Sequence, residues 1–194
     1  APFRRAIEED QVRSFILWGP PGTGKTTLAS IIARHTNCHF ITISAVLAGV
    51  KDIKEAVARA QFIASTQKKR TILFVDEIHR FNKAQQDALL PFVENGTIIL
   101  IGATTENPSF EVNSALLSRA PVFVLEPLGV EEVYSVLNRA LLNLNAGLGA
   151  LNLKVPESWL KKIAEQSSGD ARRALTMLER VAVYVKNELN EFEV

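Results

Sequence analysis

The chain has 194 residues, enough to bury the core of one domain, or of one domain with a small appendage. Hydrophobic residues make up 47% and charged residues 22%, a balance that excludes a disordered or fibrous chain. The formal net charge of +1 gives no bulk electrostatic sign of nucleic-acid binding.

Membrane and disulfide-rich classes are also excluded. No stretch approaches the ~20 apolar residues of a transmembrane helix, and the charges near the start of the chain argue against a signal peptide. Cys38 is the only cysteine, so no disulfide can form within the chain. We therefore expect a cytoplasmic protein without membrane contact.

Short β-branched runs alternate with amphipathic stretches up to about Leu125, a pattern typical of βαβ units around a parallel sheet. The predicted strands are residues 14–18, 39–43, 71–75, 97–101 and 122–125. The predicted helices are residues 26–35, 51–65, 83–94 and 113–117. Pro91 is expected to kink or shorten the third of these helices.

The strand signals stop after Pro127, and helical patterns follow at residues 130–144, 156–167 and 170–186. Residues 143–154, rich in asparagine and glycine, predict a mobile loop. The sequence thus predicts an α/β domain over residues 1–127 and a small helical domain over residues 128–194.

A glycine-rich segment lies between the first predicted strand and the helix after it. It reads Gly19-Pro20-Pro21-Gly22-Thr23-Gly24-Lys25-Thr26 and is followed by Thr27. It fits the phosphate-binding pattern G-x-x-x-x-G-K-[ST]. Gly22 and Gly24 would let backbone N–H groups approach phosphates, Lys25 would reach the β- and γ-phosphates, and Thr26 would bind Mg²⁺. The alternative, an ordinary glycine-proline turn, leaves the full motif unexplained.

Two adjacent acids, Asp76 and Glu77, end the third predicted strand. Because neighbouring strand residues point to opposite faces, these acids can take different roles. Asp76 would hold Mg²⁺ together with Thr26, and Glu77 would orient or deprotonate the attacking water. The acids could instead only cap the following helix, although the phosphate-binding motif makes this less favoured.

Four blocks of sequence, residues 15–27, 71–87, 101–110 and 113–120, resemble one family in particular. The stretches Asp76-Glu77-Ile78-His79-Arg80-Phe81-Asn82-Lys83 and Gly102-Ala103-Thr104-Thr105-Glu106-Asn107-Pro108-Ser109-Phe110 are its most specific parts. They resemble the AAA+ replication-associated recombination protein A family, whose eukaryotic relatives interact with the Werner helicase. The resemblance spans nearly the whole chain.

This resemblance implies a P-loop NTPase of AAA+ type, an α/β fold with a five-stranded parallel sheet in the order 5-1-4-3-2, flanked by helices and followed by a small helical lid domain. It identifies Thr105 as sensor 1, which helps place the water near the γ-phosphate. Arg119 matches the arginine finger, which acts in trans on a neighbouring subunit's ATP. Arg172 matches sensor 2, a nucleotide-binding residue of the lid. The implied catalytic set is Lys25, Glu77, Thr105 and Arg119.

The implied reaction is Mg²⁺-dependent hydrolysis of ATP to ADP and phosphate, coupled to replication fork maintenance, recombination and DNA repair. The implied partners are forked or single-stranded DNA and replication proteins such as single-strand binding protein. The resemblance also implies a homo-oligomer, expected to be a tetramer at full length. The implied location is the bacterial cytoplasm or nucleoid. Compared with the family, we expect this chain to lack the N-terminal segment that covers adenine and the C-terminal helical regions.

Two alternative functions stay open. The chain could be a clamp-loader subunit or a Holliday-junction branch-migration motor, or it could be a nucleotide-dependent scaffold with little turnover. Two smaller features are also open: the basic run at residues 68–70 is either a solvated loop or a DNA contact, and residues 79–81 either pack locally or relay partner binding to the site. His35, Cys38 and His39 are too few for a zinc cage.

Overall fold

The computed structural model describes residues 5, 7–145, 147–151, 153 and 155–191, with side chains described up to residue 184. Its chain divides into two compact units. The first comprises Ala1–Gly19 and Lys25–Leu125, and the second comprises Pro20–Gly24 and Glu126–Val194. Of the predicted mobile loop, residues 146, 152 and 154 lie outside the described part of the chain.

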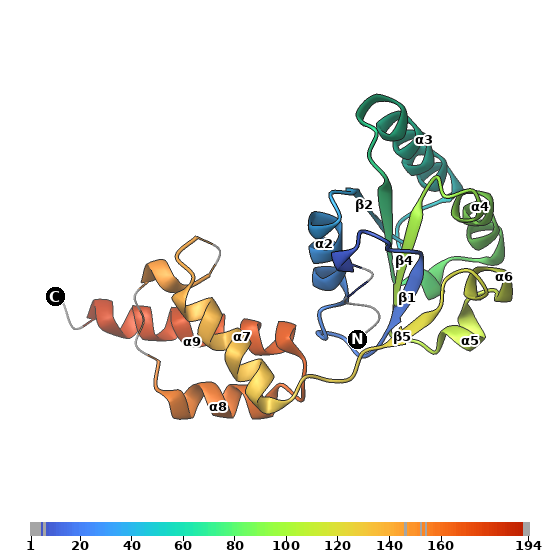
Figure 1. The fold of residues 1–194 in the computed structure, drawn as a ribbon. Coiled ribbons are helices and arrows are strands. Elements are labelled where there is room, and N and C mark those ends of the chain that lie inside the picture. Colours follow the sequence, from blue (N-terminus) through green and yellow to red (C-terminus); the bar gives the residue numbers. More distant parts are fainter. Residues whose placement is uncertain (1–4, 6, 146, 152, 154, 192–194) are drawn as a thin grey trace. The chain divides into compact units, whose positions relative to one another are not determined.

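Five parallel strands form the sheet of the first unit (Figure 1). They are β1 (Phe15–Trp18), β2 (His39–Ser44), β3 (Thr71–Asp76), β4 (Ile99–Thr104) and β5 (Val122–Val124). Their order is β2-β3-β4-β1-β5, which confirms the predicted order 5-1-4-3-2 read from the other edge. Strands β3 and β4 are buried along almost their whole length, as parallel strands covered on both faces must be.

Helices cover both faces of this sheet (Figure 1). The elements are α2 (Lys25–His35), α3 (Val50–Gln67), η1 (Ile78–Arg80), α4 (Lys83–Glu94), α5 (Pro108–Glu111) and α6 (Ser114–Leu117). On one face, Ile32 of α2 packs in a cluster with Phe74. On the other face, Ile53 of α3 and Leu89 of α4 pack in a cluster with Val75. Adjacent residues of β3 thus enter two separate cores, as the period of two along a strand requires.

The fourth strand begins and ends later than predicted, at Ile99 and Thr104 rather than at residues 97–101. The side chain of Asn95 accepts hydrogen bonds from the N–H and the hydroxyl of Thr97, at 2.9 and 2.7 Å. This local turn occupies the start of the predicted strand. The strand then continues through Gly102 because it pairs with β1 on one side and β3 on the other.

Helix α4 continues through Pro91 to Glu94, so the predicted shortening is wrong. The start of the helix is fixed by a reciprocal cap, in which the side chains of Asn82 and Gln85 each accept the other's backbone N–H at 2.9 Å. Its buried face, which includes Leu89, packs in the core of the first unit. Tertiary packing and a capped start therefore outweigh the hydrogen bond that proline removes.

The second unit contains α7 (Val130–Leu142), η2 (Gly149–Leu151), α8 (Glu157–Gln166) and α9 (Ala171–Glu191). The three α-helices share a core that includes Val133, Leu137, Leu160, Ile163 and Leu178. These residues recur at the three- and four-residue spacing of a helix face. The second unit therefore has a hydrophobic core of its own.

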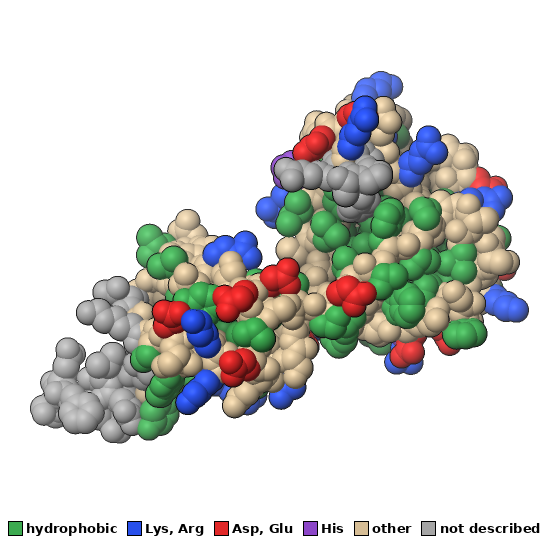
Figure 2. Space-filling model, turned by 60° about the horizontal axis from the view of Figure 1, so that its bottom comes forward, with side chains coloured by type: hydrophobic (Ala, Val, Ile, Leu, Met, Phe, Trp, Pro, Cys, Tyr) green, Lys and Arg blue, Asp and Glu red, His purple; other side chains and the backbone are tan. Residues whose placement is uncertain are grey.

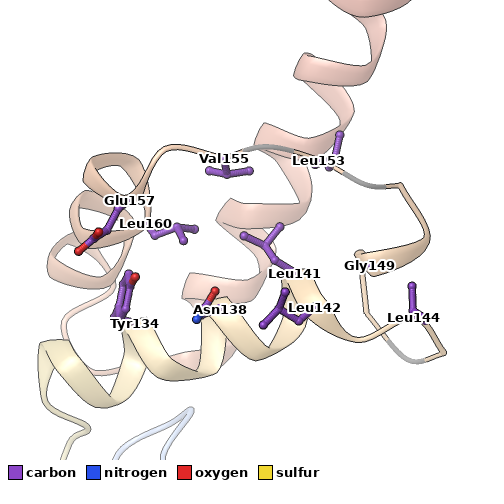
Figure 3. A pocket seen from close by; sticks show the side chains of 10 residues that line it. All are labelled: Tyr134, Asn138, Leu141, Leu142, Leu144, Gly149, Leu153, Val155, Glu157 and Leu160. Carbon is purple, nitrogen blue, oxygen red and sulfur yellow. The ribbon is translucent and has the colours of Figure 1, made fainter.

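A hollow of about 570 Å³ opens on the second unit (Figure 3). Most of its lining is leucine and valine, and its polar side chains include Tyr134 and Asn138 from α7 and Glu157 from α8. Glu157 is already paired with Lys161, at 2.8 Å. No residue predicted to bind ATP or to take part in catalysis lines this hollow.

Charges of both signs share the surface. Figure 2 shows basic and acidic side chains interspersed on the visible face, in keeping with the net charge of +1. Within the basic run, Arg70 forms an ion pair with Asp10 and donates to its carbonyl at 2.9 Å. Among the described residues, no helix combines the length and the apolar character needed to cross a bilayer.

We predict that His39 makes the first unit less stable in acid. Burial, followed by the positive charges of Arg59 and Lys69, lowers the pKa of His39 below its ordinary value of 6.5. Its Nε2 atom is buried and has no hydrogen-bond partner among the described residues. The unfolded chain therefore protonates His39 more readily than the folded chain does. The contribution of neutral His39 to the free energy of unfolding is present above pH 6.5 and is lost as pH falls through the lowered pKa of the folded state.

The measurement is the urea-unfolding midpoint of the wild type and of His39→Gln, at about pH 7.5 and about pH 5.5. The midpoint of His39→Gln should fall less between these values than that of the wild type. An equal fall in the two proteins would show that His39 does not contribute to the acid sensitivity.

Candidate functional site

The glycine-rich loop starts from a fixed point at the edge of the sheet. The N–H of Gly19 donates to the carbonyl of Thr104 at 3.2 Å, and the N–H of Leu125 donates to the carbonyl of Trp18 at 2.7 Å. A Cβ atom on Gly19 would lie 2.3 Å from the carbonyl oxygen of Leu125. Only glycine fits there, so Gly19 allows Leu125, which follows β5, to lie close to the start of the loop. Gly19 is also the first glycine of the phosphate-binding pattern.

The loop itself has the backbone that its glycines predict. Gly22 and Gly24 have φ angles of +72° and +85°, in the left-handed region that favours glycine. The hydroxyl of Thr23 donates to the carbonyl of Pro20 at 3.0 Å. Helix α2 begins at Lys25, so the loop leads directly into a helix N-terminus, a favourable place for phosphate oxygens.

Lys25 is a buried cation at the start of α2, with 8% of its surface exposed. Its Nζ donates to the carbonyl of Gly19 at 2.7 Å, which holds the ammonium against the root of the loop. Thr26 and Thr27, which follow, are exposed on the first turn. The ammonium and the Thr26 hydroxyl thus come from successive residues of the same turn.

Strand register brings the two acids to the same edge of the sheet as Gly19, the root of the loop. Val75 pairs with Gly102, and Gly102 pairs with Ile16, so the three strands are aligned in one row. Asp76 and Gly19 follow that row at the carboxyl ends of β3 and β1. Asp76 is partly exposed, so its carboxylate is accessible at this edge.

Glu77 has an unusual backbone. Its φ of 55° and ψ of 47° lie in the left-handed region, which costs a residue other than glycine about 1–3 kcal/mol. Its Oε2 lies 3.3 Å from Nδ1 of His79 and 3.5 Å from Oγ1 of Thr105. Two of the residues predicted to act in catalysis, Glu77 and Thr105, are therefore brought together, although their contact is long for a hydrogen bond.

His79 and Thr104 complete this cluster. The Nδ1 atom of His79 lies 2.9 Å from Oγ1 of Thr104, which is fully buried at the end of β4. Sequence reasoning selected Thr105 and missed Thr104. Strand alternation carried the missing signal, because two adjacent threonines at a strand end point to opposite sides.

The oxygen donors at this edge suit Mg²⁺. The hydroxyl of Thr26 is exposed on the first turn of α2, and the carboxylate of Asp76 is partly exposed at the end of β3. Mg²⁺ usually binds one or two carboxylates together with substrate phosphates and water. In the described part of the chain, no three histidine, cysteine or acidic side chains gather into a metal site of their own.

Arg119 is held by residues of α4 and α6 and their flanks. Its Nη2 pairs with Oε1 of Glu94 at 2.5 Å, and its Nη1 donates to the carbonyl of Ala115 and the hydroxyl of Ser118, both at 2.9 Å. The side chain remains 40% exposed. Arg172 is exposed in the first turn of α9, in the second unit. Arg119 makes no described contact with Glu77 or Thr105.

Two family models match the chain. The first, described as the ATPase family associated with various cellular activities (AAA), covers residues 15–128. The chain belongs to the AAA ATPase family. The second, the RCF1/5-like AAA+ ATPase lid domain, covers residues 152–183 and falls within the second unit.

Replication-associated recombination proteins are similar to this AAA chain over nearly its whole length. That of Escherichia coli K12 is 56% identical over 181 residues, which are 93% of this chain and 40% of that protein. That of Coxiella burnetii is 53% identical over 193 residues, 100% of this chain and 43% of that protein. ATPase WRNIP1 of Dictyostelium discoideum is 49% identical over 185 residues, 95% of this chain and 21% of that protein. The predicted family resemblance is confirmed, and the chain spans less than half the length of these relatives.

Solved structures of Thermotoga maritima RuvB have a similar fold. The structure described as the Holliday junction branch migration motor has a TM-score of 0.70 and 30% identity, and the match covers 92% of this chain and 57% of that one. A point mutant of the same RuvB has a TM-score of 0.72 and 28% identity, with 98% of this chain and 60% of that one covered. The predicted AAA+ fold class is therefore confirmed.

We predict that Gly19→Ala destabilises the first unit. The new methyl group would lie 2.3 Å from a backbone oxygen of Leu125, which cannot rotate away as a flexible side chain can. Such overpacking should lower the free energy of unfolding by about 1–3 kcal/mol, measured by urea titration. Gly49→Ala is the control, because its Cβ would approach only Asp52, at 3.7 Å. Equal losses in the two variants would contradict the steric argument.

Proposed function

We propose that the chain is the ATP-binding and ATP-hydrolysing core of a DNA-dependent ATPase that acts in replication fork maintenance, recombination and DNA repair. The main support is the convergence, at one edge of the sheet, of the phosphate-loop root with Asp76, Glu77 and Thr105. In this proposal residues 1–127 form the nucleotide-binding domain and residues 128–194 form the lid. The reaction is hydrolysis of ATP to ADP and phosphate with Mg²⁺.

The loop, Lys25 and the metal ligands bind and orient the phosphates. Backbone N–H groups of residues 19–27 and the N-terminus of α2 stabilise negative charge, and Lys25 neutralises charge at the β- and γ-phosphates. Thr26 and Asp76 would hold Mg²⁺, which when bound would neutralise the charge that develops on the phosphates. Since phosphoryl transfer needs little covalent chemistry from the protein, this positioning supplies much of the catalysis.

Glu77 acts on the attacking water. Its carboxylate accepts a hydrogen bond from that water and orients it towards the γ-phosphorus. It can take the water's proton as the new P–O bond forms and the bond from the γ-phosphorus to the ADP oxygen breaks, which releases ADP. The hydroxyl of Thr105 lies 3.5 Å from the Glu77 carboxylate. In this proposal it contacts the same water or the γ-phosphate. The strained backbone of Glu77 is in keeping with a functional position.

Arg119 acts in trans and Arg172 acts from the lid. A planar, permanently charged guanidinium suits the charge that spreads over the transferring phosphoryl group. Arg119 is partly exposed and paired with Glu94, so its own subunit presents it near the surface. In the assembled protein, Arg119 would contact the ATP of the neighbouring subunit, while Arg172 would contact the γ-phosphate bound to its own chain.

The fork biology is proposed by analogy with the relatives named for replication-associated recombination. The proposed partners are forked or single-stranded DNA, a homo-oligomer, expected to be a tetramer at full length, and single-strand binding protein, in the cytoplasm or nucleoid. The similarity to RuvB supports a second candidate function, that of a branch-migration motor. This candidate has less support, because the chain is 30% identical to RuvB and 56% identical to the recombination protein. Movement of Holliday junctions by the full-length protein would favour this second candidate.

We predict that Lys25→Ala and Glu77→Gln separate ATP binding from hydrolysis. Lys25→Ala should lose ATP binding, because its cation can no longer neutralise the phosphates. Glu77→Gln should still bind ATP but turn it over at least ~10²-fold more slowly, because the amide cannot accept the proton. Binding is measured with a fluorescent ATP analogue, and turnover by phosphate release, in the full-length protein.

The control for these variants is Glu106→Gln, which removes an exposed carboxylate in the segment after β4. This variant should keep both ATP binding and turnover. Normal turnover by Glu77→Gln would remove Glu77 from the mechanism.

We predict that mixing Arg119→Ala with Glu77→Gln restores part of the turnover that each full-length variant lacks. Mixed oligomers contain sites with an intact Glu77 from one subunit and an intact Arg119 from its neighbour. Loss of the finger should cost about 10³–10⁵ in rate in the pure Arg119→Ala protein. Arg34→Ala, which removes an exposed arginine at the end of α2, should leave turnover unchanged. A finger acting in cis would give no recovery in any mixture.

A further inference from the structure

We propose that His79 is a positioning residue for ATP hydrolysis, whose Nδ1–H holds the carboxylate of Glu77 against the end of β4. The inference rests on the proposed role of Glu77. The imidazole is 8% exposed, and its Nδ1 faces two oxygens, Oγ1 of Thr104 at 2.9 Å and Oε2 of Glu77 at 3.3 Å. His79 thus lies between Glu77, the acid proposed to activate water, and the end of β4, which Thr105 follows.

Counting donors and acceptors assigns the proton of the imidazole to Nδ1. The hydroxyl of Thr104 accepts from the N–H of Glu106 at 3.0 Å and lies 3.1 Å from the carbonyl of the same residue. A carbonyl only accepts, so the single hydroxyl proton goes to it, and Nδ1 of His79 must donate to the hydroxyl. The nearby carboxylate oxygen of Glu77, 3.3 Å from Nδ1, is an acceptor and is compatible with the same proton on Nδ1. The contact with Thr104 thus assigns the tautomer, and the position of Glu77 agrees with it.

The imidazole is held in place by its neighbours along the chain. The short helix η1 is closed by the N–H of Arg80, which donates to the carbonyl of Glu77 at 2.8 Å. Ile78 is fully buried, and its side chain packs so closely on Gly102 of β4 that a Cβ there would lie 3.0 Å from it. The segment that carries His79 is therefore pressed against β4, so its donor points in a fixed direction.

This donor connects the water-activating acid to the phosphate loop. The same Thr104 that accepts from His79 uses its backbone carbonyl to accept the N–H of Gly19. The path Glu77–His79–Thr104–Gly19 therefore consists of direct contacts of 2.9 to 3.3 Å. Its effect is to fix the carboxylate relative to the loop that binds the phosphates. Removing the Nδ1 donor should therefore slow hydrolysis while leaving ATP affinity almost unchanged.

The test uses the full-length protein with His79→Asn, His79→Gln and His79→Leu. An asparagine amide nitrogen can occupy the place of Nδ1, whereas a glutamine amide nitrogen reaches the place of Nε2. His79→Leu and His79→Gln should lower kcat by about 10- to 100-fold with ATP affinity and KM within about threefold of the wild type. His79→Asn should recover most of the rate. Thr104→Val should also slow turnover and should add little to the loss in His79→Leu.

The outcomes separate the two proposals. Normal turnover by His79→Leu, with Glu77→Gln inactive, would overturn the role of His79 and leave the proposed function intact. Normal turnover by Glu77→Gln would overturn the proposed function itself. If His79→Leu does not fold, the turnover rates of His79→Asn and His79→Gln test the role of the Nδ1 donor. Equal rates in these two variants, or a faster rate in His79→Gln, would overturn that role. Parallel loss of ATP affinity and rate, without recovery in His79→Asn, would also overturn it.

Discussion

The hydrogen bond from the N–H of Gly19 to the carbonyl of Thr104 is the contact on which the site depends. It fixes the root of the phosphate loop to β4, the strand next to the one that ends in Asp76. The close approach of Leu125 to Gly19 fixes the same point from β5. Because β1, β3 and β4 are parallel and in register, everything that follows their carboxyl ends lies at one edge of the sheet.

Alternation along the strands divides the chemistry at this edge. Thr104 is buried and structural, with its carbonyl facing Gly19 and its hydroxyl facing His79, while Thr105 reaches the carboxylate of Glu77. Asp76 continues β3, whereas Glu77 leaves it in a left-handed conformation. Adjacent, chemically similar residues therefore face different surroundings because of backbone geometry.

The sequence could predict those parts of the site that depend on contiguous residues. The loop of residues 19–27 and the two acids at the end of β3 are local patterns. The strand order followed from the family resemblance and was confirmed. The contact of His79 with Thr104 and the pairing of Arg119 with Glu94 join segments distant in sequence, so no local pattern contains them. The start of β4 was missed for a different, local reason, because the side chain of Asn95 forms a turn that competes with strand propensity.

The central claim is that ATP binds at the carboxyl edge of β1, β3 and β4. Hydrogen–deuterium exchange of this chain with and without Mg²⁺ and ATP tests it most directly, because it reports backbone protection along the sequence. The account predicts slower exchange with ATP at residues 19–27 and 76–80, and no change at residues 68–71, where β3 begins at the opposite edge of the sheet. Exchange that ATP leaves unchanged throughout, or slows only at the residues lining the hollow of the second unit, would contradict it.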